Sequence, residues 1–169
     1  FEDGLSDGSA PVRALAVEGL GRSEAGRKSK KLRGALEDPA GEVKSRVVKA
    51  LGRSGDHSVL PLVETAAKDE LSPVRIAAYA ALVRLGKKEA WDDLRKAADA
   101  ANPDDRTDAM RAMADLKDQR GAPLFVELLT YSQPSVRGIA ARGLGQLGWK
   151  EAREKIELLL KQTPLAGKR

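Results

Sequence analysis

Residues 21–29 resemble the glycine-rich loop that binds nucleotide phosphates. They read Gly-Arg-Ser-Glu-Ala-Gly-Arg-Lys-Ser, whereas the motif G-x-x-x-x-G-K-[ST] has its Lys directly after the second glycine. Arg27 is one residue too many for that spacing. A phosphate-binding loop also follows a strand, and this segment follows a predicted helix. The sequence therefore does not support nucleotide binding.

Other candidates for catalysis or metal binding are few. His57 is the only histidine and the chain has no cysteine, so disulfides and thiolate metal sites are excluded. His57 lies beside Asp56 in a predicted turn, where a solvent-exposed histidine is the simpler interpretation. The Asp and Glu residues show no spacing typical of acid–base catalysis. We therefore predict that the chain is not an enzyme and holds no cofactor or metal.

Basic side chains are stronger candidates for binding. Residues 27–33 hold five of them within one predicted helix, with Arg27, Lys30 and Arg33 as the candidate contacts. Equivalent positions further along the chain become mixed and then acidic, although Arg95 stays basic. A nucleic-acid backbone favours continuous positive charge, so this gradient argues against nucleic acid. It predicts a protein or acidic peptide as partner.

Two further sets of residues are candidate contacts. Arg22, Arg53 and Arg84 are each separated by 31 residues and would form a row on the surface. Cations also stabilise helix C-termini, which is the simpler explanation for such a row. Trp149 falls in a predicted turn, where an exposed tryptophan is a plausible contact. Trp91 lies on a predicted helix and is expected to be only partly buried.

The overall composition excludes some classes of function but does not point to a specific one. The net charge is +5, but acidic and basic residues are mixed along the chain, so the charge by itself does not indicate nucleic-acid binding. No apolar run approaches the roughly 20 residues that a membrane-spanning helix requires.

An internal repeat of 31 residues must position these candidates. It is anchored at Val12, Val43, Val74, Asp105 and Val136. Apolar residues recur 4, 5 and 8 positions after each anchor, on one side of a helix. Most of these helices have proline at the start and glycine at the end. A second helix follows, with apolar residues 20 and 24 positions after the anchor.

Such short helix pairs cannot bury both apolar sides alone and must stack on one another. The sequence thus predicts an all-α, right-handed superhelix of five 31-residue helical hairpins after a leading half repeat. The predicted repeat domain covers residues 1–163, with hairpins at 7–37, 38–68, 69–99, 100–130 and 131–162, the end of a preceding repeat at 1–6 and a tail at 164–169. We expect the C-terminal part of a longer protein, with a charged last helix and an open N-terminal end that could self-associate.

This pattern resembles the HEAT-like repeats of phycobilisome lyases and bacterial scaffold proteins. Residues 7–21, 38–52 and 69–82 each read Asp, then Val-Arg or Val-Lys, then a closing Leu, and the resemblance covers about residues 1–162. It implies a hydrogen-bonded ladder between neighbouring repeats, formed by Asp7, Asp38 and Asp69 with Arg13, Lys44, Arg75, Arg106 and Arg137. Ala100 and Tyr131 replace the Asp further on, and Asp105 replaces an anchor Val, so the ladder is expected in the first repeats only.

The resemblance implies a fold and leaves the function open, because this architecture hosts many binding roles. We predict a non-enzymatic scaffold that binds a protein or peptide along the surface of the second helices. One alternative is a nucleic-acid-binding solenoid similar to the HEAT-like alkylpurine glycosylases, which need a continuous basic concave face. Another is an accessory C-terminal domain of a larger enzyme, such as a zinc aminopeptidase, with its chemistry upstream.

Overall fold

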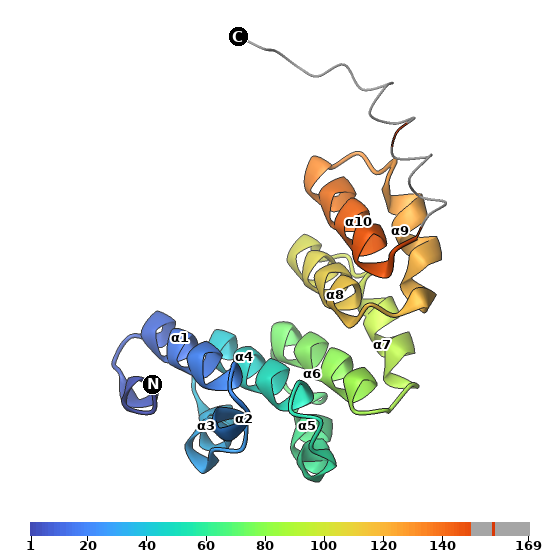
Figure 1. Cartoon of the computed structure of the whole chain (residues 1–169). Helices are drawn as coiled ribbons and strands as arrows, with labels where there is room; N and C mark the ends of the chain where they lie inside the picture. The colour runs from blue at the N-terminus through green and yellow to red at the C-terminus, as the bar shows by residue number, and fades with distance from the viewer. Residues whose placement is uncertain (150–156, 158–169) are drawn as a thin grey trace. The chain divides into compact units, whose positions relative to one another are not determined.

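The computed structural model describes residues 1–149 and 157, and these residues form helices and no strand. The first helix of each hairpin is a regular α-helix. These helices are α1 (Ala10–Gly21), α4 (Gly41–Gly52), α6 (Ser72–Arg84), α8 (Pro103–Leu116) and α10 (Pro134–Leu147) (Figure 1). Each begins 31 residues after the previous one, which is the predicted repeat length. The all-α prediction is confirmed.

The second helices are shorter and more irregular. They are α2 (Glu24–Arg27), α3 (Lys30–Gly34), α5 (Leu60–Ala66), α7 (Ala90–Ala97) and α9 (Ala122–Leu128), with short 3-10 turns η1 (Asp3–Ser6), η2 (Ala35–Glu37), η3 (His57–Val59) and η4 (Gln119–Gly121). The predicted last helix falls outside the described residues apart from Glu157, which is helical and exposed. The predicted charged cap therefore stays a prediction.

The prediction of one continuous helix over residues 27–33 is wrong. Arg27 ends α2, and α3 begins only at Lys30. Between them Ser29 has an extended backbone, with φ −61° and ψ 131°, so the helix axis is interrupted there. Arg27 and Lys30 consequently lie on different helices, and the five basic residues do not form one stripe.

The turns before the first helices are closed by oxygen atoms of Asp or Asn side chains. An oxygen of Asp38 accepts a hydrogen bond from the Ala40 amide at 2.8 Å. Asp7 and Asp69 make the same bond two residues ahead, at 2.8 and 2.9 Å. Asn102 does so in the next repeat, at 2.8 Å. These side chains satisfy amide groups that the start of a helix leaves without a partner.

The chain divides into two compact units, Phe1–Ala112 and Met113–Arg169, with the division inside α8. In unit 1, α4 packs between α1 and α6, and the second helices α5 and α7 pack against α6 (Figure 1). In unit 2, α9 packs against α10. Each unit therefore repeats the same contact between a first helix and its second helix.

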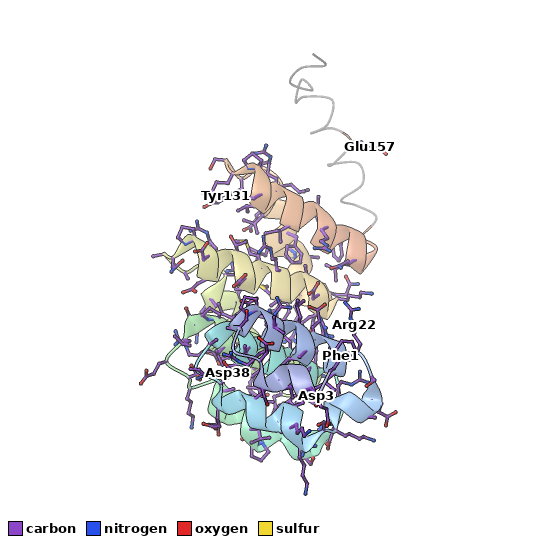
Figure 2. The ribbon with its side chains drawn as sticks, turned by 90° about the vertical axis from the view of Figure 1, so that its left-hand side faces the viewer. Phe1, Asp3, Arg22, Asp38, Tyr131 and Glu157 are labelled. Carbon is purple, nitrogen blue, oxygen red and sulfur yellow. The ribbon has the colours of Figure 1, made fainter. Side chains whose placement is uncertain are left out.

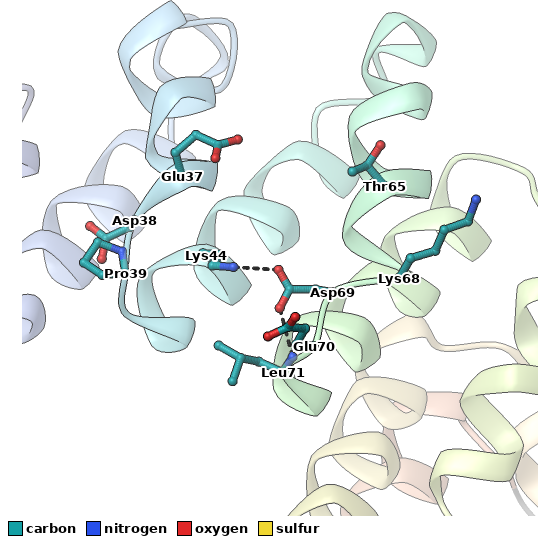
Figure 3. Close-up of a pocket in the computed structure, with 9 residues that line it drawn as sticks. All are labelled: Glu37, Asp38, Pro39, Lys44, Thr65, Lys68, Asp69, Glu70 and Leu71. Carbon is teal, nitrogen blue, oxygen red and sulfur yellow. Dashed lines mark hydrogen bonds and ion pairs between the residues drawn. The ribbon is translucent and has the colours of Figure 1, made fainter.

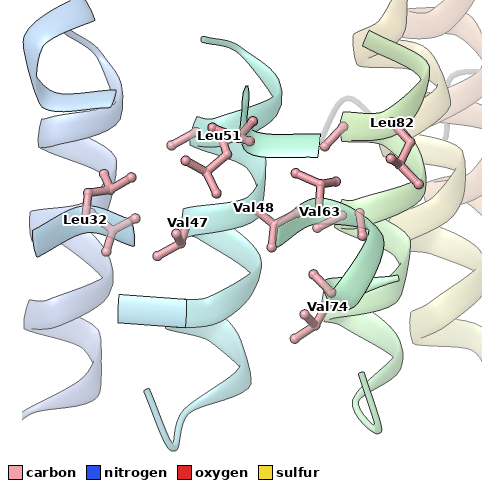
Figure 4. Close-up of a cluster of buried hydrophobic side chains, with 14 of the residues drawn as sticks. Leu32, Val47, Val48, Leu51, Val63, Val74 and Leu82 are labelled. Carbon is pink, nitrogen blue, oxygen red and sulfur yellow. The ribbon is translucent and has the colours of Figure 1, made fainter. Parts of the chain in front are cut away.

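The core consists of the predicted apolar columns. The second-helix residues Leu32, Val63, Leu94 and Phe125 are completely buried, and Figure 4 shows the first two beside residues of α4 and α6. Three of the anchor valines are also buried, at Val43, Val74 and Val136. Val12, on the end helix α1, is 41% exposed. Trp91 is only 5% exposed, so it is buried more deeply than predicted.

Successive first helices approach each other through very small residues. A β-carbon built on Gly52 would lie 2.5 Å from Cβ and 2.7 Å from Cα of Ala81. One repeat earlier, a β-carbon on Gly21 would lie 2.9 Å from Cβ of Ala50. These distances are shorter than atoms can normally approach, so the spacing between the helices depends on glycine at both positions.

Gly52→Ala should therefore destabilise unit 1. We expect a loss of about 1–3 kcal/mol in the free energy of unfolding, because the added methyl group forces α4 and α6 apart. Urea unfolding followed by circular dichroism measures it. Gly34→Ala is the matched control, since a β-carbon there meets nothing within 4 Å and alanine favours the helix by about 0.5–1 kcal/mol. Equal effects of the two substitutions would contradict the close helix contact.

Candidate functional site

The predicted row of arginines lies at the C-terminal ends of the first helices. Arg22 follows α1, Arg53 follows α4, and Arg84 is the last residue of α6. Because α4 packs between α1 and α6 and the three helices start in register, their C-terminal ends lie on one edge of unit 1. The chain turns toward the second helices at the same edge, and the segment after α1 includes Arg27, the last residue of α2, and Lys30, the first residue of α3.

The two edges of unit 1 have opposite charge. The turns within the hairpins, residues 22–30, 53–58 and 84–89, hold eight Lys or Arg residues and three Asp or Glu residues; we call them the basic edge. The turns between repeats, residues 6–9, 37–42, 68–72 and 99–104, hold eight acidic residues and one Lys; we call them the acidic edge. Figure 2 shows Arg22 and Asp38 on opposite sides of unit 1.

Several of the predicted contact residues have partners within the chain. Arg22 donates to Glu18 at 2.9 Å, and Arg27 donates to the Gly21 carbonyl at 2.9 Å. Arg95 donates to Asp99 at 2.5 Å. The bond of Arg27 satisfies a carbonyl at the end of α1, so this side chain stabilises the helix terminus. Arg27 is thus as much a capping residue as a candidate contact.

Other cations at or near the basic edge are exposed and form no ion pair with the described residues. They are Lys30, at the start of α3, Lys49, in the last turn of α4, and Arg53. Their charges are directed to solvent from two neighbouring repeats. An acidic partner could pair with these cations without breaking an interaction inside the protein, which makes them the best-placed contacts on the edge.

The remaining candidates lie elsewhere. Trp149 is half-buried, and its backbone amide donates to the Leu144 carbonyl at 3.1 Å in unit 2. Its contact role stays a prediction. His57 is exposed in η3, as expected. Residues 21–29 form the end of α1, a turn and α2, with the Ser23 hydroxyl accepting from the Gly26 amide at 3.0 Å. They lack the strand–loop–helix arrangement of a phosphate loop.

Arg33 joins two repeats, which the sequence analysis missed. Its Nη2 donates to Asp56 in the next hairpin turn at 3.1 Å. One repeat later the charges of the two partners are exchanged, because Glu64 on the second helix forms an ion pair with Lys87 in the next turn at 3.5 Å. Arg33 and Glu64 are 31 residues apart, as are Asp56 and Lys87. This paired reversal of charge was the signal in the sequence that could have revealed the interaction.

The ladder implied by the family resemblance is present in the first repeats. Arg13 donates two hydrogen bonds to the Asp38 carboxylate, from Nε to Oδ2 at 2.6 Å and from Nη2 to Oδ1 at 2.9 Å. Lys44 donates to Asp69 at 2.6 Å (Figure 3). The bonds from Arg13 hold the pKa of the Asp38 carboxyl below its ordinary value, and Lys44 lowers the pKa of Asp69 in the same way.

The ladder changes where its carboxylates are replaced. Ala100 stands one repeat after Asp69, and the next junction uses a different bond, from the Ser72 hydroxyl to Asp105 at 2.6 Å. Asp105 is the residue that replaces an anchor valine. Arg75, Arg106 and Arg137 still donate to backbone carbonyls of their own preceding turns. Those bonds hold each turn but do not join neighbouring repeats.

A groove of about 830 Å³ follows the ladder on the acidic edge (Figure 3). Its polar lining includes Lys44 and Asp69, which bind each other, together with Glu37, Lys68 and Glu70. Leu71 supplies an apolar part of the wall and is 42% exposed. The free charges are of both signs, so the groove does not specify a ligand class.

The part of the chain that the structure describes contains no cluster of three or more His, Cys, Asp or Glu residues that could hold a metal ion. None of the described helices combines the length and apolar character of a membrane span.

A family model described as HEAT repeats matches residues 1–82, 29–114 and 91–166. The chain belongs to the HEAT repeat family. Comparison with curated proteins finds no match. Among solved structures, this HEAT repeat chain is similar to the complex of CpcE and CpcF of phycocyanin lyase from Nostoc sp. PCC7120, with a TM-score of 0.57 and 24% identity over 99% of this chain and 70% of that chain.

A second similar structure is that of an engineered protein. It has a TM-score of 0.51 and 16% identity, covering 98% of this chain and 88% of that chain. At these identities the two structures establish a common helical-repeat fold and no shared activity. Together with the family match they confirm the resemblance drawn from the repeat pattern.

Asp38→Asn should destabilise the protein by about 2 kcal/mol at neutral pH, the usual contribution of a hydrogen bond to a charged group. Asparagine keeps the acceptor for the Ala40 amide and removes only the charge that Arg13 binds. Urea unfolding at neutral and acidic pH measures the effect. Asp7→Asn is the control, because Asp7 caps its turn but forms no ion pair among the described residues.

The pH dependence has a definite sign. The pKa of Asp38 is lowered in the folded state, so its contribution is complete above the unfolded value of about 3.9. That contribution is lost as the pH falls through the lowered value. The difference between wild type and Asp38→Asn should therefore shrink in acid. A difference that is constant with pH would show that the ion pair does not stabilise the fold.

Proposed function

We propose that the chain is a non-enzymatic protein-interaction module that binds an acidic peptide or acidic protein surface along its basic edge. The observation that carries this proposal is the set of exposed cations Lys30, Lys49 and Arg53, which have no acidic partner among the described residues. Arg22 and Arg84 lie on the same edge in the neighbouring repeats. The predicted repeat boundaries, with a repeat domain over residues 1–163, form part of the proposal.

The charge on the edge favours a short acidic segment over a nucleic acid. Acidic residues such as Glu24, Asp56 and Glu89 interrupt the cations along the basic edge, and a phosphate backbone would meet each of them in turn. Affinity for nucleic acid grows with the number of phosphates that are neutralised. A peptide can instead place its carboxylates opposite the cations and its neutral residues elsewhere.

A partner protein also fits the architecture. Stacked repeats form long surfaces that present side chains from several hairpins at fixed separation. The similar CpcE–CpcF structure is itself a complex of two proteins, which supports a protein partner for this chain. Self-association through the N-terminal end of the repeats stays a prediction.

Arg53→Glu should weaken binding of a fluorescently labelled hexaglutamate peptide about tenfold, because it replaces an attraction by a repulsion on the edge. Fluorescence anisotropy at low salt measures the dissociation constant. Lys68→Glu is the matched control: it makes the same change in net charge at an exposed position on the acidic edge. Equal weakening by both variants, or tighter binding of a short DNA duplex than of the peptide, would refute the proposal.

A further inference from the structure

Arg13, the arginine that completes a ladder bond, makes two separate sets of hydrogen bonds. In Arg13, Nη1 donates to the carbonyls of Asp7 and Gly8, at 2.9 and 3.3 Å, and fixes the guanidinium on its own turn. The other side of the group, Nε and Nη2, faces the next repeat and holds both oxygens of Asp38. The backbone bonds thus orient a donor pair that matches a carboxylate in spacing and plane.

Arg75 also binds the carbonyls of its own turn, but it has no ladder aspartate of the next repeat to bind. Its Nη1 donates to the carbonyls of Asp69 and Glu70, both at 2.8 Å, just as Arg13 is fixed. The next repeat, however, has Ala100 where the preceding repeats have Asp38 and Asp69. Within the described part of the chain, no carboxylate accepts from Nε or Nη2 of Arg75. An oriented donor pair is therefore left without its acceptor.

A cavity of about 280 Å³ lies at this gap in the ladder. Arg75 and Ala100 both line it, together with Tyr79 and Lys96. Since one water occupies about 30 Å³ of liquid, the cavity is large enough for a carboxylate on a short side chain. All its lining residues belong to unit 1, so the site does not depend on the second unit.

The acidic residues of the cavity have other partners. Asp105 accepts from the Ser72 hydroxyl at 2.6 Å, and Asp93 lies 3.4 Å from the Lys96 ammonium group. Neither forms an ion pair with Arg75. Two basic and two acidic side chains line the cavity, so its formal charge is balanced. A lining without net positive charge disfavours a doubly charged phosphate, so the attraction for a carboxylate would come from the paired donors of Arg75.

We propose that this cavity binds a carboxylate of another polypeptide, which takes the place of the missing ladder aspartate on Arg75. The ligand is a Glu or Asp side chain or a C-terminal carboxylate, the two sources of the same planar anion. The site lies on the opposite edge of unit 1 from Arg53 and is independent of the proposed basic edge. A partner segment bound here would bridge two repeats as Asp38 does.

The test is a titration followed through the Arg75 Nε–H resonance in a nitrogen–proton NMR spectrum. The probes are Ac-Gly-Glu-Gly-NH2, with a side-chain carboxylate, and Ac-Gly-Gly-Gly-OH, with a terminal carboxylate. At least one should shift the resonance in a saturable manner, and the one that does identifies the source. Ac-Gly-Gln-Gly-NH2 should cause no shift. Absence of a saturable shift with both carboxylate probes would overturn the proposal.

Ala100→Asp supplies the internal carboxylate and should close the site. We expect its apparent affinity for the active probe to fall at least tenfold, because the new side chain competes for the same donors. Ala101→Asp adds the same charge at an exposed residue outside the lining and should change the affinity less than threefold. Unchanged binding in Ala100→Asp, or equal loss in both variants, would overturn the proposal.

Arg75→Gln provides a second variant that does not rely on the new aspartate. Followed through the Ala100 backbone amide, it should lose at least tenfold in affinity, and Arg75→Lys should recover only part of it, because lysine keeps the charge but not the paired donors. Full affinity in Arg75→Gln would contradict the assignment. Hexaglutamate binding that depends on Arg53 should be the same in all these variants, so each proposal can fail without the other.

Discussion

The close contact between successive first helices sets the geometry of unit 1. Gly21 and Gly52 allow α1, α4 and α6 to approach at the positions of Ala50 and Ala81, so these helices stack in register. A single hairpin has too few residues to hold its helices together, and isolated helices of this length are marginal in water. The apolar columns become a core only because each hairpin covers the next.

The two charged edges follow from that stacking. In unit 1 the register places the starts of the first helices on one side and their ends on the other, where the backbone of these helices favours acidic and basic side chains respectively. On the acidic edge two carboxylates stabilise the fold, because Asp38 and Asp69 cap their turns and bind cations of the preceding repeat. On the basic edge several cations have no such task. This difference between the two edges is the physical basis for proposing that an acidic segment binds along the basic edge.

Much of the fold could be predicted from the sequence, because the 31-residue period fixes which residues share a face. The burial of Leu32, Val63 and Leu94 follows from that period, whereas the ladder bond of Arg13 was implied by the resemblance to HEAT-like repeats. Features that depend on one local backbone conformation could not be predicted. Ser29 interrupts a helix that periodicity alone would continue. The contact of Arg33 with Asp56 required knowledge of how one second helix lies against the next turn. The replacement of the ladder aspartate by Ala100 could be recognised from the sequence. The cavity beside Ala100 could not be predicted.

The dependence of each hairpin on its neighbours can be measured most directly on a single repeat. Far-UV circular dichroism of residues 38–68, prepared as an isolated peptide, should show little helix and no cooperative thermal transition, whereas the full chain should be helical and unfold cooperatively. The peptide contains all of α4 and α5, so loss of structure would come only from removal of the adjacent repeats. A peptide that is helical and melts cooperatively by itself would contradict the account, because the hairpin would then be stable without the contacts that align the edges.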